Sequence, residues 1–230
     1  MISIFGDFLS LFFPNNCLAC GNSLFKNEDT ICTSCLYHLP QTDFHLSKGN
    51  RLCEVFWGRV RIETAVANFY YGKSGKVQSL IHQLKYKGKK EVGTFFGKYY
   101  GKMLQYSGNF DSVNYIVPVP LHEKKLKLRG YNQSEIFARG LSVSMHVPVN
   151  IVVLSRRIPT QTQTKRNRYN RWENVSGIFE VNRIELLRNK HILLVDDVIT
   201  TGATLEACCH ALFKVPGIKI SIAAIAYARK

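Results

Sequence analysis

Apolar residues recur with two different spacings along this chain, and the two spacings alternate. One helical face of residues 75–88 holds the apolar side chains Val77, Leu80, Ile81 and Leu84, and residues 92–104 repeat that pattern. Short apolar runs predict strands at 64–71, 114–120, 149–154, 176–181, 191–197 and 219–228, and further helices are predicted at 133–142 and 203–214. This alternation predicts an α/β domain with a largely parallel sheet and helices on both faces.

The unusual segments of the chain follow the predicted strands directly. Sheets of this kind bind ligands outside the carboxyl ends of their strands. The stretches after "IVPVP", "NIVVL" and "HILLVDD" are basic, polar or rich in small residues. We therefore expect a functional site at this edge of the sheet.

The stretch "LLVDDVITTGAT" carries the clearest chemistry. A turn of small residues that leads into a helix offers backbone N–H groups and the positive end of the helix dipole to an anion. The expected phosphate-binding residues are Thr200, Thr201, Gly202, Ala203 and Thr204. Asp196 and Asp197 would repel a phosphate but can accept hydrogen bonds from vicinal hydroxyls, so the pattern indicates ribose 5-phosphate. The alternative is a pair of aspartates that caps the helix.

Four of the seven cysteines form a C-x2-C-x11-C-x2-C pattern near the start of the chain: Cys17, Cys20, Cys32 and Cys35. Two close thiolate pairs can surround Zn²⁺, and four protein ligands make such a metal structural rather than catalytic. Two disulfides are the alternative. We expect a small module over residues 1–55, which begins with an apolar helix, and a second domain over residues 56–230.

Composition and charge narrow the choice of partners. No apolar run is long enough to span a bilayer. The first residues lack a basic region and a cleavage site, so we expect no signal peptide and a cytoplasmic protein, whose reducing surroundings favour zinc. The net charge is +15. Residues 120–175 hold eleven Lys and Arg but three acids. This distribution favours polyanionic partners such as nucleic acid or phosphorylated metabolites.

The motif "LLVDDVITTGAT" resembles the phosphoribosyl-pyrophosphate (PRPP) signature of type I phosphoribosyltransferases. The cysteine module, "LKYKG", "VPVPLHEKKLKLRGYNQSE" and "RWENVSGIF" together resemble the ComF family of competence-associated proteins, over nearly the whole chain. This resemblance implies the phosphoribosyltransferase fold, with a small four-cysteine zinc module before it. It also implies displacement of pyrophosphate from ribose.

The resemblance assigns roles to individual residues. Asp196 and Asp197 would contact the ribose hydroxyls, and residues 200–204 would hold the 5-phosphate. Pyrophosphate, with Mg²⁺, would be held by residues 121–131, and residues 155–174 would form a basic hood. Family positions also include Gln163 and Asn174. The basic residues expected to face phosphate are Lys85, Lys124, Lys125, Lys127, Arg129 and Arg171, of which Arg129 joins the two aspartates as a catalytic candidate.

Two functions remain open on the sequence. The first is a PRPP-dependent transferase whose acceptor is unidentified. The second is a non-catalytic competence factor that binds single-stranded DNA or a helicase-like protein of the competence machinery through its basic face. Tyr131, Tyr169 and Trp172 lie among arginines, a combination typical of single-stranded DNA binding.

Overall fold

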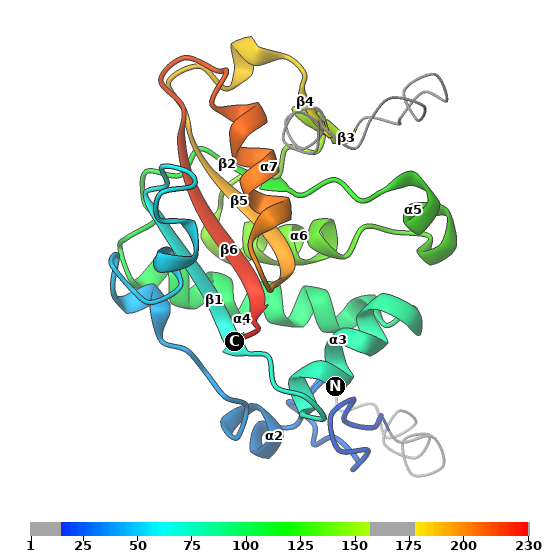
Figure 1. The fold of residues 1–230 in the computed structure, drawn as a ribbon. Coiled ribbons are helices and arrows are strands. Elements are labelled where there is room, and N and C mark those ends of the chain that lie inside the picture. The colour runs from blue at the N-terminus through cyan, green and yellow to red at the C-terminus, as the bar shows by residue number, and fades with distance from the viewer. Residues whose placement is uncertain (1–14, 157–177, 230) are drawn as a thin grey trace, which may run out of the picture.

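A four-stranded parallel sheet forms the centre of the molecule in a computed structural model, which describes residues 15–156 and 178–229 (Figure 1). The strand order is β1-β6-β5-β2. The strands are β1 (Thr64–Tyr70), β2 (Tyr115–Pro118), β5 (His191–Ile199) and β6 (Lys219–Tyr227), and every neighbouring pair is parallel. The predicted parallel sheet is confirmed. Because its strands are mostly apolar and buried, both faces require cover.

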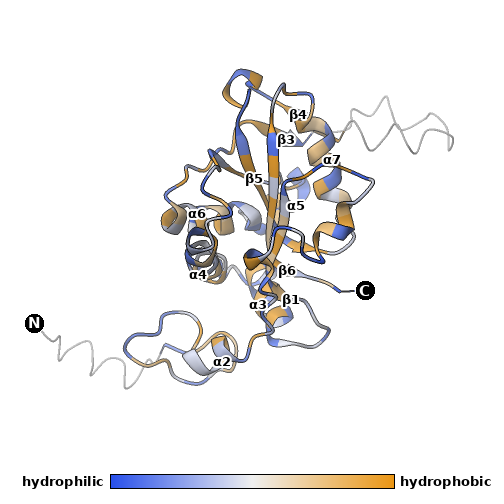
Figure 2. Ribbon diagram, turned by 90° about the vertical axis from the view of Figure 1, so that its left-hand side faces the viewer, coloured by the Kyte–Doolittle hydropathy of each residue, from blue (hydrophilic) through white to orange (hydrophobic). Residues whose placement is uncertain are grey.

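Helices supply that cover on both faces, as predicted. Seen along the edge of the sheet, α4 and α6 lie on one side and α7 on the other (Figure 2). The longer helices are α3 (Lys76–Tyr86), α4 (Lys90–Tyr106), α6 (Gln133–Met145) and α7 (Ala203–Leu212). A short helix, α5 (Glu123–Arg129), projects from the body on an extended arm (Figure 1) and has no buried residue.

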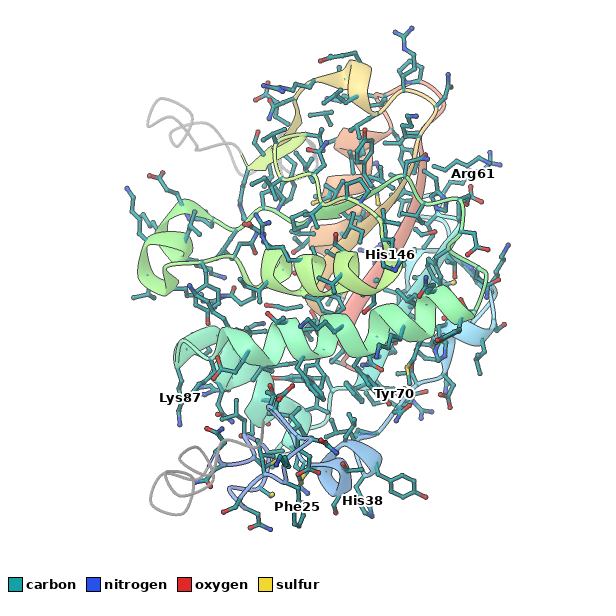
Figure 3. All side chains as sticks on the ribbon, turned by 180° about the vertical axis from the view of Figure 1, so that it is seen from behind. Phe25, His38, Arg61, Tyr70, Lys87 and His146 are labelled. Carbon is teal, nitrogen blue, oxygen red and sulfur yellow. The ribbon has the colours of Figure 1, made fainter. Side chains whose placement is uncertain are left out.

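Glycines allow α4 and α6 to approach each other closely. The two helices run side by side across the molecule (Figure 3). A Cβ atom added to Gly97 would lie 2.5 Å from the carbonyl oxygen of Phe137 and 2.6 Å from the Cα of Gly140. Gly93 and Gly101, one turn to either side, also face α6. This contact holds α6 in place and thereby fixes its amino-terminal end, which reaches the carboxyl edge of the sheet.

The predicted strand at 149–154 is wrong in most of its length. Val149 makes only an isolated parallel bridge with Ile116. The side chain of Asn150 then accepts a hydrogen bond from the N–H of Val152, and this turn replaces the strand. A short antiparallel pair follows instead, which consists of β3 (Leu154–Arg156) and β4 (Phe179–Val181). The predicted strand at 176–181 therefore joins β3 and not the central sheet.

The amino-terminal part of the described chain packs against β1 through residues 41–56. It contains α2 (Thr33–Tyr37) and two 3-10 helices, η1 (Phe44–Leu46) and η2 (Cys53–Phe56); a third, η4 (Ile184–Leu186), precedes β5. The side chain of Asn50 donates to the carbonyl of Ala65 in β1. The division at residue 55 stays a prediction, and the predicted first helix lies outside the described residues. In the described parts, no helix is long and apolar enough to cross a membrane.

Candidate functional site

The two aspartates lie side by side near the carboxyl end of β5, where other elements hold them. One oxygen of Asp196, Oδ1, accepts hydrogen bonds from the hydroxyl of Ser134 at 2.9 Å and from the N–H of Asp197 at 2.8 Å. Asp197 forms an ion pair with Lys85, in which Nζ lies 2.8 Å from Oδ1. The site thus joins β5 to the last turn of α3 and the first turn of α6.

Burial changes the protonation of this pair. Burial is the main cause that raises the pKa of Asp196 to about 7, and the charge of Asp197 adds to the effect. Hydrogen bonds from the N–H of Asp197 and from Ser134 oppose the rise, as does the charge of Lys85. Asp196 is therefore poised between acid and carboxylate near neutral pH.

The small-residue turn follows β5 as expected, and it forms a hollow. The hollow is lined by Asp196, Val198 and residues 199–205. Gly202 has a φ of +74° and precedes the first residue of α7, so backbone N–H groups at the start of that helix border the hollow. Threonine hydroxyls and backbone N–H groups can donate hydrogen bonds into the hollow, and this makes it suited to one phosphate group. The lining residues include no lysine or arginine.

Arg59 braces this turn from outside. Its Nη1 atom donates to the carbonyl of Thr201 at 2.8 Å and to that of Val55 at 3.0 Å, and its Nη2 atom pairs with Glu206 of α7. A side chain at Gly202 would meet Phe56 and Val55 at 3.0 Å. The sequence analysis did not identify Arg59. No sequence signal could reveal it, because it lies 142 residues before Thr201.

The stretch "RGYNQSE" supplies the support for Asp196. Asn132 caps α6 by accepting from the N–H of Ser134, and it donates to the carbonyl of Val119 after β2. These bonds fix the turn that aims Ser134 at Asp196. The sequence analysis missed this role for Ser134. The signal was an asparagine immediately before a predicted helix, which is a frequent capping residue.

Arg129 lies at the junction of α3 and α6, where it contacts the residues next to Lys85 and Ser134. Its Nη1 atom donates to the side chain of Gln133 at 2.7 Å, and its guanidinium lies over the ring of Tyr86, 5.0 Å from the centroid. Tyr131 closes the same junction by donating its hydroxyl to the carbonyl of Leu84. The structure therefore brings Arg129 next to the residue that follows Lys85.

The other predicted basic residues are not gathered at the aspartates. Lys124, Lys125 and Lys127 lie on the projecting helix α5, away from the turn at 200–204 (Figure 1). Lys127 pairs with Glu123 at 2.7 Å. Arg171, Gln163, Asn174 and nearly all of the expected basic hood at 155–174 lie outside the described residues.

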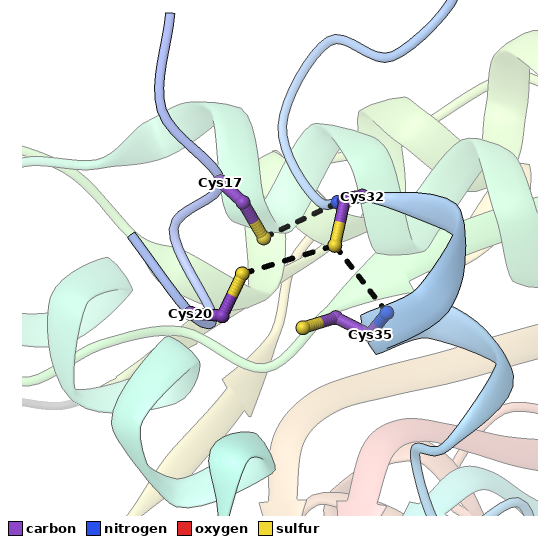
Figure 4. Close-up of side chains that lie close together, drawn as sticks. All are labelled: Cys17, Cys20, Cys32 and Cys35. Carbon is purple, nitrogen blue, oxygen red and sulfur yellow. Dashed lines mark hydrogen bonds between the residues drawn. The ribbon is translucent and has the colours of Figure 1, made fainter. Parts of the chain in front are cut away.

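The four cysteines converge as the spacing predicts (Figure 4). Their sulfur atoms all lie within 4.8 Å of one another, and those of Cys20 and Cys32 are 3.8 Å apart. A tetrahedral site with Zn–S bonds of about 2.3 Å has edges of about 3.8 Å, so these thiols could hold such an ion. All four are free thiols, so the disulfide alternative is absent from the described structure.

Helix α3 connects the cysteine cluster to the aspartates. At its first turn, the Nζ atom of Lys76 lies 3.3 Å from the sulfur of Cys35. Further along, the side chain of Gln83 donates to the carbonyl of Leu18 at 2.7 Å. Lys85, in the last turn, reaches Asp197. One helix thus contacts both candidate sites.

Known proteins resemble this chain in its sequence. A family model described as a phosphoribosyl transferase domain matches residues 132–230. The DNA utilization protein YhgH of Escherichia coli K12 is 28% identical over 203 residues, which are 86% of this chain and 84% of that protein. Competence protein ComFC of Bacillus subtilis is 25% identical over 205 residues, 86% of this chain and 78% of the relative.

Solved structures of phosphoribosyltransferases are also similar. One is the glutamine PRPP amidotransferase of B. subtilis complexed with ADP and GMP, with 17% identity and a TM-score of 0.42. The match covers 61% of this chain and 30% of that longer one. The family-model match begins at the capped turn before α6 and includes both aspartates and the turn at 200–204, whereas Lys85 and the cysteines lie before it.

Proposed function

Because the chain belongs to the ComF family and carries a phosphoribosyltransferase domain, we propose that it binds PRPP and transfers its ribose 5-phosphate to an acceptor. The observation that carries this proposal is the placement of two carboxylates beside a hollow of N–H and hydroxyl donors. A phosphate in the hollow would leave the ribose hydroxyls next to Asp196 and Asp197.

The reaction would be a displacement at C1 of the ribose. The bond between C1 and the pyrophosphate oxygen breaks, a bond from C1 to the acceptor forms, and the acceptor loses a proton. Positioning of the sugar and stabilisation of the leaving pyrophosphate would do most of the work, so no protein nucleophile is needed. The turn at 200–204 and the aspartates would fix the sugar, while Arg129 is our candidate for the departing anion.

Two metal ions belong to the proposal in different roles. Mg²⁺ would be held mainly by pyrophosphate oxygens and water, as is usual for this ion at phosphate sites. Zn²⁺ would be held by Cys17, Cys20, Cys32 and Cys35 and would stabilise the fold of the small module. Ligation requires thiolates. Burial acts to raise the pKa of Cys17, but N–H donors from Cys32, Ala19 and Cys20 together lower it to about 7, whereas burial raises the pKa of Cys35 to about 12. A reducing compartment such as the cytoplasm would preserve these thiols.

Calorimetric titration of PRPP with Mg²⁺ tests the binding step. We expect the wild type to bind and the double variant Asp196→Asn/Asp197→Asn to lose roughly a hundredfold in affinity, because two charged acceptors are replaced by neutral amides. The variant is more positively charged than the wild type, so general attraction of the anion cannot explain such a loss. Asp111→Asn, on an exposed residue, is the matched control. Equal affinity in wild type and double variant would refute the site.

A second candidate function is binding of single-stranded DNA. It is favoured by the exposed, projecting helix α5, where Lys124, Lys125 and Lys127 lie within four residues. Relatives of this chain are called competence and DNA utilization proteins. Proteins of the competence machinery would be the expected protein partners. The two functions can be tested separately, because the three lysines lie on α5, whereas Asp196 and Asp197 lie on β5 (Figure 1).

A further inference from the structure

Lys85 reaches the aspartates from a helix that lies outside the matched phosphoribosyl transferase domain. It comes from α3, outside the part of the chain that matches the phosphoribosyl transferase domain. It nevertheless makes an ion pair of 2.8 Å with Asp197, and the side chains are 22% and 13% exposed. Among the described residues, it is the only cation paired with either of the two aspartates.

The charges of the site give Lys85 two possible partners. The hollow for the 5-phosphate is lined by neutral donors and Asp196, so it does not require the ammonium group. Without a ligand, the ammonium neutralises Asp197. A ligand that brings only hydroxyl groups to Asp197 leaves the ammonium where it is, because hydroxyls offer no replacement negative charge.

A ligand with a second anionic group at C1 changes this balance. The ammonium of a lysine is a compact charge on a flexible stem of four carbons, and it can turn from one anion to a neighbouring one. Such a ligand would supply a new partner for Lys85 and free Asp197 for the ribose hydroxyls. The exchange gives the ammonium a new anionic partner, while the ribose hydroxyls donate hydrogen bonds to Asp197.

From this geometry we propose that Lys85 determines specificity by exchanging Asp197 for the pyrophosphate of the ligand, so that the site selects PRPP over ribose 5-phosphate. This inference rests on the proposed function, because both ligands use the same hollow and the same aspartates. It assigns to α3 a part in ligand selection that the matched domain alone would lack.

The experiment compares the affinities of PRPP and ribose 5-phosphate, both titrated with Mg²⁺ into the full-length protein. We expect Lys85→Met to reduce the ratio of the two affinities at least about tenfold, because a shielded charge then lacks its partner. Lys85→Arg, which keeps the charge, should retain most of the ratio. Lys87→Met removes the same charge from an exposed position after α3 and should leave the ratio unchanged.

The outcomes separate this inference from the proposed function. If Lys85→Met weakens both ligands equally, Lys85 only holds Asp197 in place, and the selectivity role is overturned. The selectivity role is also overturned if Lys85→Met changes neither affinity. If the folded wild type binds neither ligand, the proposed function fails and the inference fails with it. Circular dichroism of each variant establishes that the comparison is made between folded proteins.

Discussion

Near neutral pH, Asp196 lies close to the midpoint of its titration, because burial and the neighbouring Asp197 raise its pKa to about 7. Below this pH the protonated side chain is a poorer acceptor of the hydrogen bonds that ribose hydroxyls donate. Above it, the ionised carboxylate accepts them fully. Binding of the sugar should therefore be coupled to loss of a proton from Asp196.

This coupling predicts that PRPP affinity rises with pH between 6 and 8. A group with a pKa of about 7 is roughly one-tenth ionised at pH 6, so the expected change is about tenfold. Ser134→Ala removes a hydrogen bond that lowers the pKa of Asp196, and it should move the midpoint to higher pH. Titrations at several pH values measure the midpoint.

Ser144→Ala is the control for this comparison. Ser144 lies on the same helix as Ser134, but its hydroxyl donates to the carbonyl of Lys98 in α4, away from the aspartates. The ionisation of the ligand itself is common to all three proteins, so it cancels when midpoints are compared. A midpoint that is identical in Ser134→Ala and the wild type would contradict the role of Asp196 in binding.

Individual site residues could be predicted from the sequence where residues that are close together in the chain form one site. The aspartates and the turn at 200–204 form one stretch, and the cysteines form two close pairs. Lys85, Ser134 and Arg59 act through partners that lie far away in the chain. Their roles depend on how α3, α6 and η2 pack, and packing leaves no local pattern. The single sequence could therefore identify the ligand chemistry but not its supports.

At the scale of elements, α3 is the part that makes the molecule act as one unit. Its first turn contacts a cysteine of the cluster through Lys76, and Gln83 binds the backbone of Leu18. Its last turn pairs Lys85 with Asp197. An α-helix rises about 1.5 Å per residue, so the nine steps from Lys76 to Lys85 span roughly 14 Å of rigid rod. Disorder of the cysteine module at the first turn of α3 should therefore change the position of Lys85 in its last turn.

Removal of the metal tests this connection. We expect a chelator to unfold the cysteine module, because metal binding supplies much of the folding free energy of so small a unit. The Lys76 and Gln83 contacts are then lost, and PRPP affinity should fall roughly fivefold or more, the effect of about 1 kcal/mol of lost positioning. Zinc release, circular dichroism and calorimetry are measured on the same sample.

Readdition of Zn²⁺ should restore both the module and the affinity, which controls for irreversible damage. A metal-free protein that binds PRPP as tightly as the zinc-loaded protein would show that α3 keeps its position without the module. The contact between α4 and α6 gives an internal reference, since it is formed by Gly97 and Gly140, outside the cysteine module. Its helical signal should survive the chelator.

Elements were predictable where the apolar pattern was long, and less so where it was short. The helices at 75–88 and 92–104 are confirmed because their apolar faces repeat over several turns. The run "VNIVVL" has the composition of a buried strand, yet Asn150 forms a turn inside it. A single hydrogen-bonding side chain there outweighs propensity. The glycines Gly93, Gly97 and Gly101 recur every four residues on one face of α4, and this spacing is the pattern in the sequence that indicates its close packing on α6.

At the scale of the whole molecule, charge is distributed unevenly relative to the sheet. The net charge is +15, and the exposed helix α5 presents three lysines beyond the body of the protein. Such an arm meets a polyanion before the rest of the surface does. Attraction of this kind is independent of sequence and weakens with salt, because bound cations are released from the nucleic acid.

This arrangement predicts salt-sensitive binding of single-stranded DNA through α5. We expect the affinity for a thymidine oligonucleotide, measured by fluorescence anisotropy, to fall steeply as salt rises. Changing Lys124, Lys125 and Lys127 to alanine should reduce the salt slope by about two, since each phosphate contact on a single strand contributes about 0.7. The aspartates and the turn at 200–204 are untouched, so the triple variant should bind PRPP as the wild type does.

A second triple variant separates the arm from net charge alone. Arg188, Lys214 and Lys219 are exposed near the amino-terminal ends of β5 and β6, and their replacement by alanine removes the same charge. If α5 is the binding element, this control keeps nearly the full salt slope. Equal losses in both variants would assign DNA binding to the overall charge, and the absence of binding in the wild type would leave ribose-phosphate chemistry as the function of this fold.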